Sequence, residues 1–161
     1  MANKKSQKIL AEEFLKLHHD KKVLLLPNAW DVVTAKICEK LGFKAIGTTS
    51  AGISSTLGYP DGQVMSLKEN LSVVRRIVDS TNLPVNADLE SGYSDSVEGA
   101  VVAAQAALDI GVAGINLEDS TGVEEKPFFE IEEAVERIKA VSRGLGRAPG
   151  SLAKGQPIPP P

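Results

Sequence analysis

The stretch PVNADLESGYSDSVEGAVVAAQAALDIGVAGINL, residues 84–117, contains the pattern that decides the fold class. An apolar strand at 84–87 is followed by an Ala- and Val-rich helix at 96–110, which Gly111 ends, and then by a second strand at 112–117. Strand, helix and strand in this order predict two parallel strands joined by a right-handed crossover.

The same alternation extends outward on both sides of this unit. Continuous apolar runs such as Val23-Leu24-Leu25-Leu26 are typical of parallel strands that are covered on both faces. The capping box Ser66-Leu67-Lys68-Glu69 marks the start of a helix. Further strands are expected at 23–26 and 45–48, helices at 6–20, 30–41, 66–80 and 130–143, and a long Gly-, Ser- and Pro-rich loop at 52–63. We therefore predict an α/β fold of about four β/α units, preceded by an extra helix.

Composition narrows the class of protein. The 161 residues include 18 Lys and Arg against 21 Asp and Glu, which gives a net charge of −3. A protein with this charge has no excess of positive charge to attract nucleic acid, so a nucleic-acid partner is not expected. No apolar run approaches the roughly 20 residues that span a bilayer, so no membrane association is expected. The single cysteine, Cys38, excludes an internal disulfide framework. These features predict a cytoplasmic protein.

The pattern of strands and helices stops near residue 145. Five of the nine prolines lie between Pro149 and Pro161, in a segment that also contains Gly150 and Gly155. Such a segment cannot join a parallel sheet. We predict one domain over 1–145, which holds the four β/α units and the helix before them, and a disordered Gly/Pro-rich tail over 146–161.

Polar residues follow each expected strand at its carboxyl end. They are Asn28, the Thr48-Thr49-Ser50 run, Asp88, and the Glu118-Asp119 pair. In parallel α/β folds the loops at this edge bind ligands. Asp88 and Glu118 together could hold a hard cation such as Mg²⁺, which takes one or two carboxylates plus waters and substrate oxygens. The absence of His and Cys nearby disfavours zinc.

Each of these residues also has a purely structural interpretation. Asp88 could cap the next helix, and Glu118 could be an ordinary acid in a first helical turn. Asn28 could be a turn residue. The run from Thr49 to Gly52 could be a plain loop, or a loop whose backbone N–H groups bind a carboxylate or phosphate. Their coincidence at one edge of the sheet favours a binding site.

Four segments carry a family resemblance. They are LPNAWD at 26–31, TTSAGI at 48–53 with LGYPDG at 57–62, VNADLESGY at 85–93, and GINLEDS at 114–120. With these motifs in this order, the sequence resembles the isocitrate lyase/phosphoenolpyruvate mutase superfamily, and within it the phosphoenolpyruvate phosphonomutase-like branch. The similarity covers roughly residues 10 to 143. It implies that the four β/α units are the N-terminal half of a TIM-type (β/α)8 barrel.

The resemblance also implies an activity. Such enzymes are Mg²⁺- or Mn²⁺-dependent lyases and mutases, similar to phosphoenolpyruvate mutase, oxaloacetate decarboxylase and methylisocitrate lyase. They break or form a C–C or P–C bond in a small α-keto or α-hydroxy acid through a pyruvate enolate. By motif, Asp88 and Glu118 match the metal-site acids, and Asp61 matches an acid near the outer shell of the metal. The run Thr49-Ser50-Ala51 matches the loop that holds the substrate carboxylate.

Two departures from the family pattern concern the chemistry. Asn86 stands where the family often has the first Asp of Asp-x-Asp. Its amide oxygen can still bind a metal, but the site has one negative charge fewer than with aspartate, and Glu90 could supply that charge. The loop after Glu118 contains Ser120-Thr121-Gly122 and lacks the cysteine that isocitrate and methylisocitrate lyases use as catalytic acid. Classical isocitrate lyase activity is therefore not expected.

A third departure concerns length, because the family barrel has eight strands and this chain supplies four. We therefore interpret the chain as a truncated member whose first and fourth strands are open edges. Two copies could pair as a homo-oligomer to close a barrel, or the sheet could flatten into an open layer. The alternative to an enzyme is a non-catalytic remnant that binds a metal or small acid, or that associates with a full-length paralogue. A metal-dependent pyruvate aldolase is a third possibility.

Overall fold

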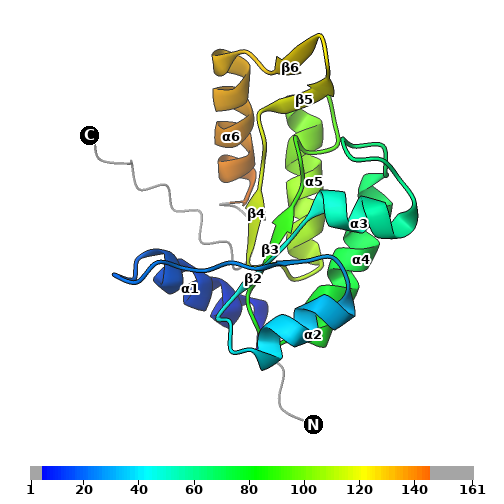
Figure 1. Ribbon diagram of the computed structural model, residues 1–161. Helices are drawn as coiled ribbons and strands as arrows, with labels where there is room; N and C mark the ends of the chain where they lie inside the picture. The colour runs from blue at the N-terminus through cyan, green and yellow to red at the C-terminus, as the bar shows by residue number, and fades with distance from the viewer. Residues whose placement is uncertain (1–4, 146–161) are drawn as a thin grey trace.

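The computed structural model describes residues 5–145, and it shows an α/β fold built on a parallel sheet (Figure 1). The strands are β1 (Asn28–Ala29), β2 (Ile46–Thr48), β3 (Val85–Asp88) and β4 (Gly114–Asn116), in the order β1-β2-β3-β4. Every neighbouring pair is parallel, which confirms the predicted fold class. The predicted tail over 146–161 lies outside the described residues.

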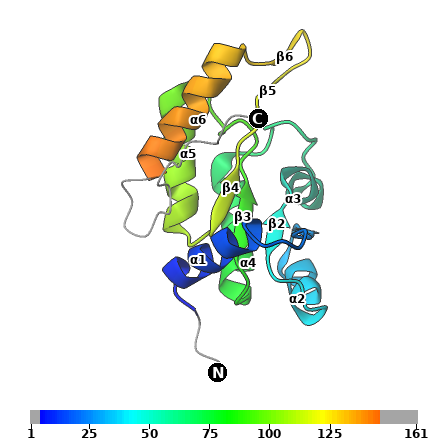
Figure 2. The same cartoon turned by 90° about the vertical axis from the view of Figure 1, so that its left-hand side faces the viewer.

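The helices are α1 (Gln7–His18), α2 (Val32–Lys40), α3 (Ser50–Leu57), α4 (Leu67–Ser80), α5 (Val97–Asp109) and α6 (Ile131–Leu145). Of these, α2, α4, α5 and α6 form a layer over one face of the sheet. Figure 2 shows α4 and α5 behind the strands, with α2 and α6 continuing the layer at its two ends. Buried aliphatic side chains such as Val74, Ile77 and Val112 fill the space between helices and sheet. The carboxyl ends of the strands are left open to loops.

The capping box predicted at Ser66 fixes the start of α4. The Ser66 hydroxyl accepts a hydrogen bond from the backbone N–H of Glu69, at 3.3 Å, and the Glu69 carboxylate accepts one from the Ser66 N–H, at 3.0 Å. Both donors would otherwise be unpaired at the helix start. The long face of α4 can therefore pack on the sheet in a defined register.

The prediction of a strand at 23–26 is wrong, because the structure has no strand there. The structure places β1 at Asn28–Ala29, and Val23 and Leu25 are 87% and 70% exposed. The register pairs Asn28 with Gly47 and Ala29 with Thr48, so the next partner back along the chain would be Pro27. Because proline has no N–H, the ladder does not extend into the apolar run.

Helix α3 and the two strands of a hairpin were not predicted. Helix α3 occupies the first half of the segment expected to be a loop at 52–63; Thr49 caps its start and Gly58, with φ +82°, ends it. After β4, the strands β5 (Ser120–Val123) and β6 (Lys126–Phe128) form an antiparallel hairpin. Helix α3 and the hairpin lie at the carboxyl ends of the parallel strands (Figure 1).

Helix α1 packs across the opposite, amino-terminal ends of the strands. The Gln7 side chain donates to the carbonyls of Leu108 and Val112, at 2.7 and 3.0 Å, and the Phe14 ring lies against Gly114. Within residues 5–145, none of the helices combines the length and apolarity that crossing a membrane requires.

Candidate functional site

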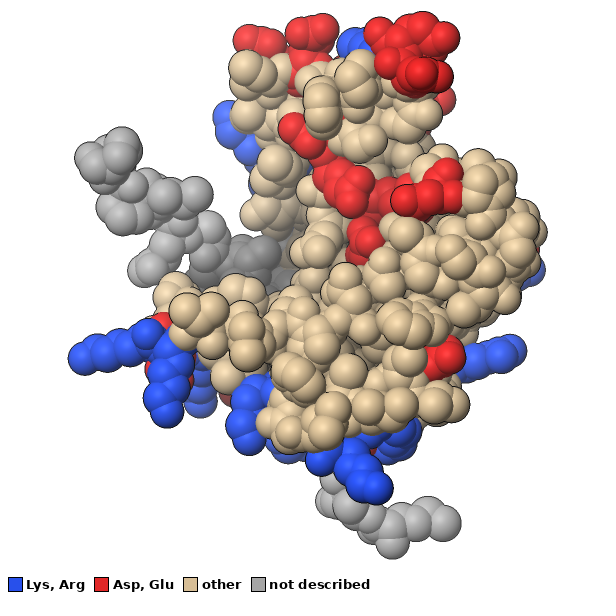
Figure 3. All heavy atoms as spheres, in the orientation of Figure 1, with Lys and Arg blue, Asp and Glu red and all other residues tan. Residues whose placement is uncertain are grey.

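A polar pocket of about 290 Å³ lies at the carboxyl ends of β2, β3 and β4. Its lining residues are mostly acids, hydroxyl side chains and glycines: Thr49, Ser50, Ala51, Asp61, Gly62, Gln63, Asp88, Glu90, Ser91, Glu118, Ser120 and Gly122. Neither lysine nor arginine belongs to this lining set. Figure 3 shows acidic side chains gathered over this end of the molecule, whereas the lysines and arginines in view lie mainly toward the other end.

The carboxylate of Asp88 is held by the start of α3. Its Oδ2 atom accepts hydrogen bonds from the backbone N–H and the hydroxyl of Ser50, at 2.9 and 2.8 Å. Asp88 therefore faces the N-terminus of α3. It does not cap the helix that follows it, because the cap of α5 is Ser96.

The backbone at Asp88 is held from two other elements. Its N–H donates to the hydroxyl of Thr48 on β2, at 2.9 Å. Its carbonyl accepts from the Asn70 amide on α4, at 3.1 Å. Asn70 is fully buried, so the end of β3 is positioned by groups that solvent does not reach.

The loop after β3 has an unusual backbone. Glu90 and Tyr93 have φ angles of +48° and +54°, and Gln63, across the pocket, has +60°. These are the non-glycine residues with positive φ among the described part of the chain, and all three lie in or beside the pocket. Left-handed backbone at such residues persists only where the surroundings hold it, and it gathers at functional sites.

Two glutamates of the pocket have raised pKa values. Burial raises the pKa of Glu90, and the nearby charges of Asp88 and Asp61 raise it further, although a hydrogen bond from Tyr93 opposes them. The partial burial of the Glu118 carboxyl raises its pKa as well, again with contributions from Asp88 and Asp61. The pocket therefore concentrates negative charge that no basic lining residue neutralises.

The structure brings together most of the site residues predicted from the sequence. Thr49, Ser50, Ala51, Asp61, Asp88 and Glu118 all line the pocket. Asn86 does not: its side chain is buried, and its Nδ2 donates to Oδ1 of Asn116 at 2.9 Å, on the face of the sheet where Gly114 leaves room for it. Gln63 and Ser91 were not predicted. The glycines beside them, Gly62 and Gly92, were the available sign of tight turns at this position.

The donor set suits a hard divalent cation. Carboxylate, hydroxyl and amide oxygens surround the pocket, and these are the ligands that such cations prefer. Within residues 5–145, no three acidic, histidine or cysteine side chains already converge on one point. A cation bound here would therefore be held by one or two carboxylates, with waters and ligand oxygens completing its shell.

Comparison with known proteins decides the family. The family model described as phosphoenolpyruvate phosphomutase matches residues 14–150, most of the chain. The chain belongs to this family. A 2-methylisocitrate lyase of Halalkalibacterium halodurans is 29% identical over 145 residues, which are 86% of this chain and 48% of that protein. An uncharacterized protein of Mycobacterium tuberculosis is 40% identical over 108 residues, 67% of this chain and 40% of that protein.

Solved structures of this superfamily share the fold. A Burkholderia cenocepacia protein assigned to the lyases or mutases superposes with a TM-score of 0.84 at 34% identity, covering 89% of this chain and 51% of that one. Phosphonopyruvate hydrolase, solved with oxalate and Mg²⁺, gives a TM-score of 0.79 at 21% identity, covering 92% and 50%. The chain thus spans about half the length of the curated relatives it matches, and its four β/α units correspond to half of a family barrel.

Proposed function

We propose that this chain carries the metal- and carboxylate-binding part of a lyase or mutase that acts on a small α-keto or α-hydroxy acid through a pyruvate enolate. The reaction would break or form a C–C or P–C bond. The observation that carries the proposal is a pocket that Asp88 and Glu118 both line, where Asp88 accepts hydrogen bonds from Ser50 at the start of α3 and where no lysine or arginine is among the lining residues. Membership of the phosphoenolpyruvate phosphomutase family supports the same reaction class.

Asp88 and Glu118 are the residues that would hold Mg²⁺ or Mn²⁺, directly or through water. When bound, the ion would supply Lewis-acid stabilisation of the negative charge that develops on the substrate. Glu90 and Asp61 add negative charge to the same pocket. The resemblance adds Asn86 to the metal ligands; because its amide pairs with Asn116, the geometry favours Glu90 as the source of the additional charge.

The start of α3 is suited to hold the substrate carboxylate. Thr49, Ser50 and Ala51 line the pocket at the start of this helix, where the Ser50 N–H donates to Asp88 and the Gly52 N–H donates to the Thr49 hydroxyl. Such N–H groups have no partner within a helix, and the helix dipole places partial positive charge there. A carboxylate bound to α3 would lie beside Asp88 only when a cation separates the two charges, which makes acid binding dependent on the metal.

A second candidate function is binding without turnover. The observation that favours it is Asn86, which stands where the family often has an acid and which pairs with Asn116 outside the pocket lining. In that case the pocket binds a metal and a small acid, alone or beside a longer relative. Metal-dependent binding is common to both candidates, and turnover separates them.

The test is release of pyruvate from phosphonopyruvate and from oxaloacetate in the presence of Mg²⁺. The proposal expects turnover that Asp88→Ala abolishes and that Asp119→Ala, a change in an exposed acid outside the pocket, leaves intact. Metal-dependent binding of oxalate without turnover would favour the second candidate. Neither turnover nor binding would overturn both.

A further inference from the structure

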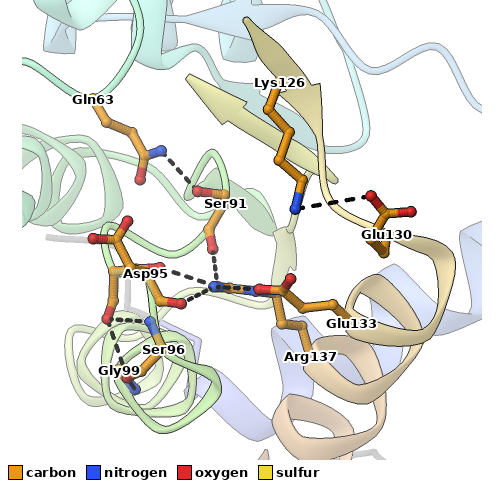
Figure 4. A network of polar contacts seen from close by, with 10 residues as sticks. Gln63, Ser91, Asp95, Ser96, Gly99, Lys126, Glu130, Glu133 and Arg137 are labelled. Carbon is orange, nitrogen blue, oxygen red and sulfur yellow. Dashed lines mark hydrogen bonds and ion pairs between the residues drawn. The ribbon is translucent and has the colours of Figure 1, made fainter. Parts of the chain in front are cut away.

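Arg137 on α6 is a buried cation whose role the proposed chemistry does not use. Its side chain is 1% exposed, and its guanidinium points at the loop that follows β3 (Figure 4). One nitrogen donates to the carbonyls of Ser91 and Ser94, at 3.3 and 3.0 Å. The other donates to the carbonyl of Asp95 and lies 3.4 Å from the carboxylate of Glu133.

These contacts reach the pocket through Ser91. The Ser91 hydroxyl accepts a hydrogen bond of 2.7 Å from the Gln63 side chain, and both residues line the pocket. Figure 4 shows Gln63, Ser91 and Arg137 in one continuous line of contacts. Glu90 precedes Ser91, and its backbone carbonyl accepts a hydrogen bond of 2.7 Å from the N–H of Glu118. Arg137 is thus connected, through Ser91 and the backbone next to it, to the pocket acids Glu90 and Glu118.

Arg137 also contacts the segment that returns from the β5–β6 hairpin. Its guanidinium carbon lies 4.0 Å from the centre of the Phe129 ring, within the range of a cation–π interaction. The N–H of Phe129 donates to the carbonyl of Asp119, at 2.9 Å, next to Glu118. One buried side chain therefore touches both the loop after β3 and the segment after the hairpin.

We propose that Arg137 is a positioning residue that sets the divalent-cation affinity of the pocket. It fixes the loop of Glu90 and Ser91 on one side and the Phe129 segment on the other, so that Glu90 and Glu118 face the same space. The proposal rests on the metal-binding function proposed above. The left-handed backbone at Glu90 and Tyr93 needs such support, because strained backbone relaxes when its surroundings loosen.

Lysine cannot replace arginine in this role. The planar guanidinium presents several N–H groups in a fixed fork, whereas the ammonium of lysine is a single compact point charge. Arg137→Lys keeps the charge and most of the volume, but its donors all lie on one nitrogen, so it cannot reach the carbonyls that two separate guanidinium nitrogens contact. Arg143, an exposed residue on the same helix, offers a matched control for the substitution itself.

The experiment measures Mn²⁺ binding to the full chain by electron paramagnetic resonance, which counts free Mn²⁺ and needs no turnover. Arg137→Lys is expected to weaken binding about tenfold, the scale on which outer partners of metal sites act. Arg143→Lys is expected to bind as wild type does. Val141→Ala, in the buried face of α6, controls for lost stability and is also expected to keep wild-type affinity.

Wild-type affinity in a folded Arg137→Lys variant, or an equal loss in Val141→Ala, would overturn the role of Arg137 while leaving the proposed function standing. Absence of Mn²⁺ binding by the wild type would overturn the proposed function itself, and this inference with it. If Arg137→Lys does not fold, Phe129→Leu removes the ring contact instead. Weakened Mn²⁺ binding in that variant supports the proposal, and unchanged binding contradicts it.

Discussion

The Tyr93 hydroxyl donates a hydrogen bond of 3.0 Å to the carboxylate of Glu90, and both residues have left-handed backbone. The same hydroxyl accepts a 2.9 Å hydrogen bond from the buried amide of Asn70. Burial and the charge of Glu90 raise the pKa of Tyr93, so its hydroxyl stays protonated and remains a donor. The loop after β3 is thereby tied to α4 at the position where it delivers an acid to the pocket.

The raised pKa values of Glu90 and Glu118 predict that metal binding strengthens with pH. A cation needs the deprotonated carboxylates, and protons compete for them at low pH. We therefore expect Mn²⁺ to bind more tightly at pH 8 than at pH 5, with the change beginning above the ordinary glutamate value of 4.5. The dissociation constant measured across this range by paramagnetic resonance checks it, and a flat profile would contradict it.

The same shifts predict how the metal-free protein responds to pH. A carboxyl whose pKa is raised on folding holds its proton more tightly in the folded state, so its contribution to stability is present at low pH and is lost as pH rises through the raised pKa. Glu69, whose pKa is lowered by hydrogen bonds from Ser66 and Tyr59, acts in the opposite direction. Urea unfolding of wild type and of Glu118→Gln at several pH values tests this. We expect the variant to become more stable relative to wild type as pH rises. A difference in unfolding free energy that does not change with pH would contradict the raised pKa of Glu118.

Asn86→Asp tests which residue supplies the additional charge. The new carboxylate would be buried beside Asn116 and Gly114, away from the pocket lining. We expect a loss of roughly 1–3 kcal/mol in the free energy of unfolding at pH 8, because a buried group loses its pairing, and no gain in Mn²⁺ affinity. Urea unfolding and Mn²⁺ titration of the same variant check both parts. Tighter Mn²⁺ binding would instead make position 86 a metal ligand.

Gly92→Ala tests the packing of the loop after β3 on α5. Gly92 has φ +97°, and an added Cβ would lie 2.7 Å from Cβ of Ala100 and 2.8 Å from its Cα. Gly58, with φ +82° and open space around it, gives a control in which the backbone strain is present without the clash. We expect Gly58→Ala to lose about 1–2 kcal/mol of stability, and Gly92→Ala to lose roughly 1–3 kcal/mol more. Equal losses in the two variants would show that the clash relaxes freely.

The general fold could be predicted because it depends on periodicity and on helix boundaries. Ser66 and Ser96 cap helices where the sequence predicts them, and the apolar stripes of α4 and α5 face the sheet. Periodicity and helix boundaries could not exclude a strand at 23–26, because an apolar run does not reveal whether a partner strand lies beside it. The pairing stops at Pro27 for a reason of register, which only the relative position of β2 supplies.

The candidate site could be predicted only in part. Asp88, Glu118 and the Thr49–Ala51 run follow strands, so their common edge follows from parallel topology alone. Gln63, Ser91 and Arg137 come from a turn, a loop and a distant helix, and their convergence depends on tertiary contacts that no local pattern encodes. Asn86, although only two residues before Asp88, pairs with its neighbour on β4, where the adjacent glycine provides space.

The most direct test of the proposed function is the thermal unfolding of wild type and Asp88→Ala, each with and without Mg²⁺ plus oxalate, a mimic of the pyruvate enolate. Ligand at about 100 times its dissociation constant stabilises a folded protein by about 2.7 kcal/mol, which raises the midpoint by several degrees. We predict this rise for wild type, only when metal and oxalate are both present, and no rise for Asp88→Ala. An unchanged wild-type midpoint, or an equal rise in Asp88→Ala, would contradict a metal-dependent acid site at this pocket.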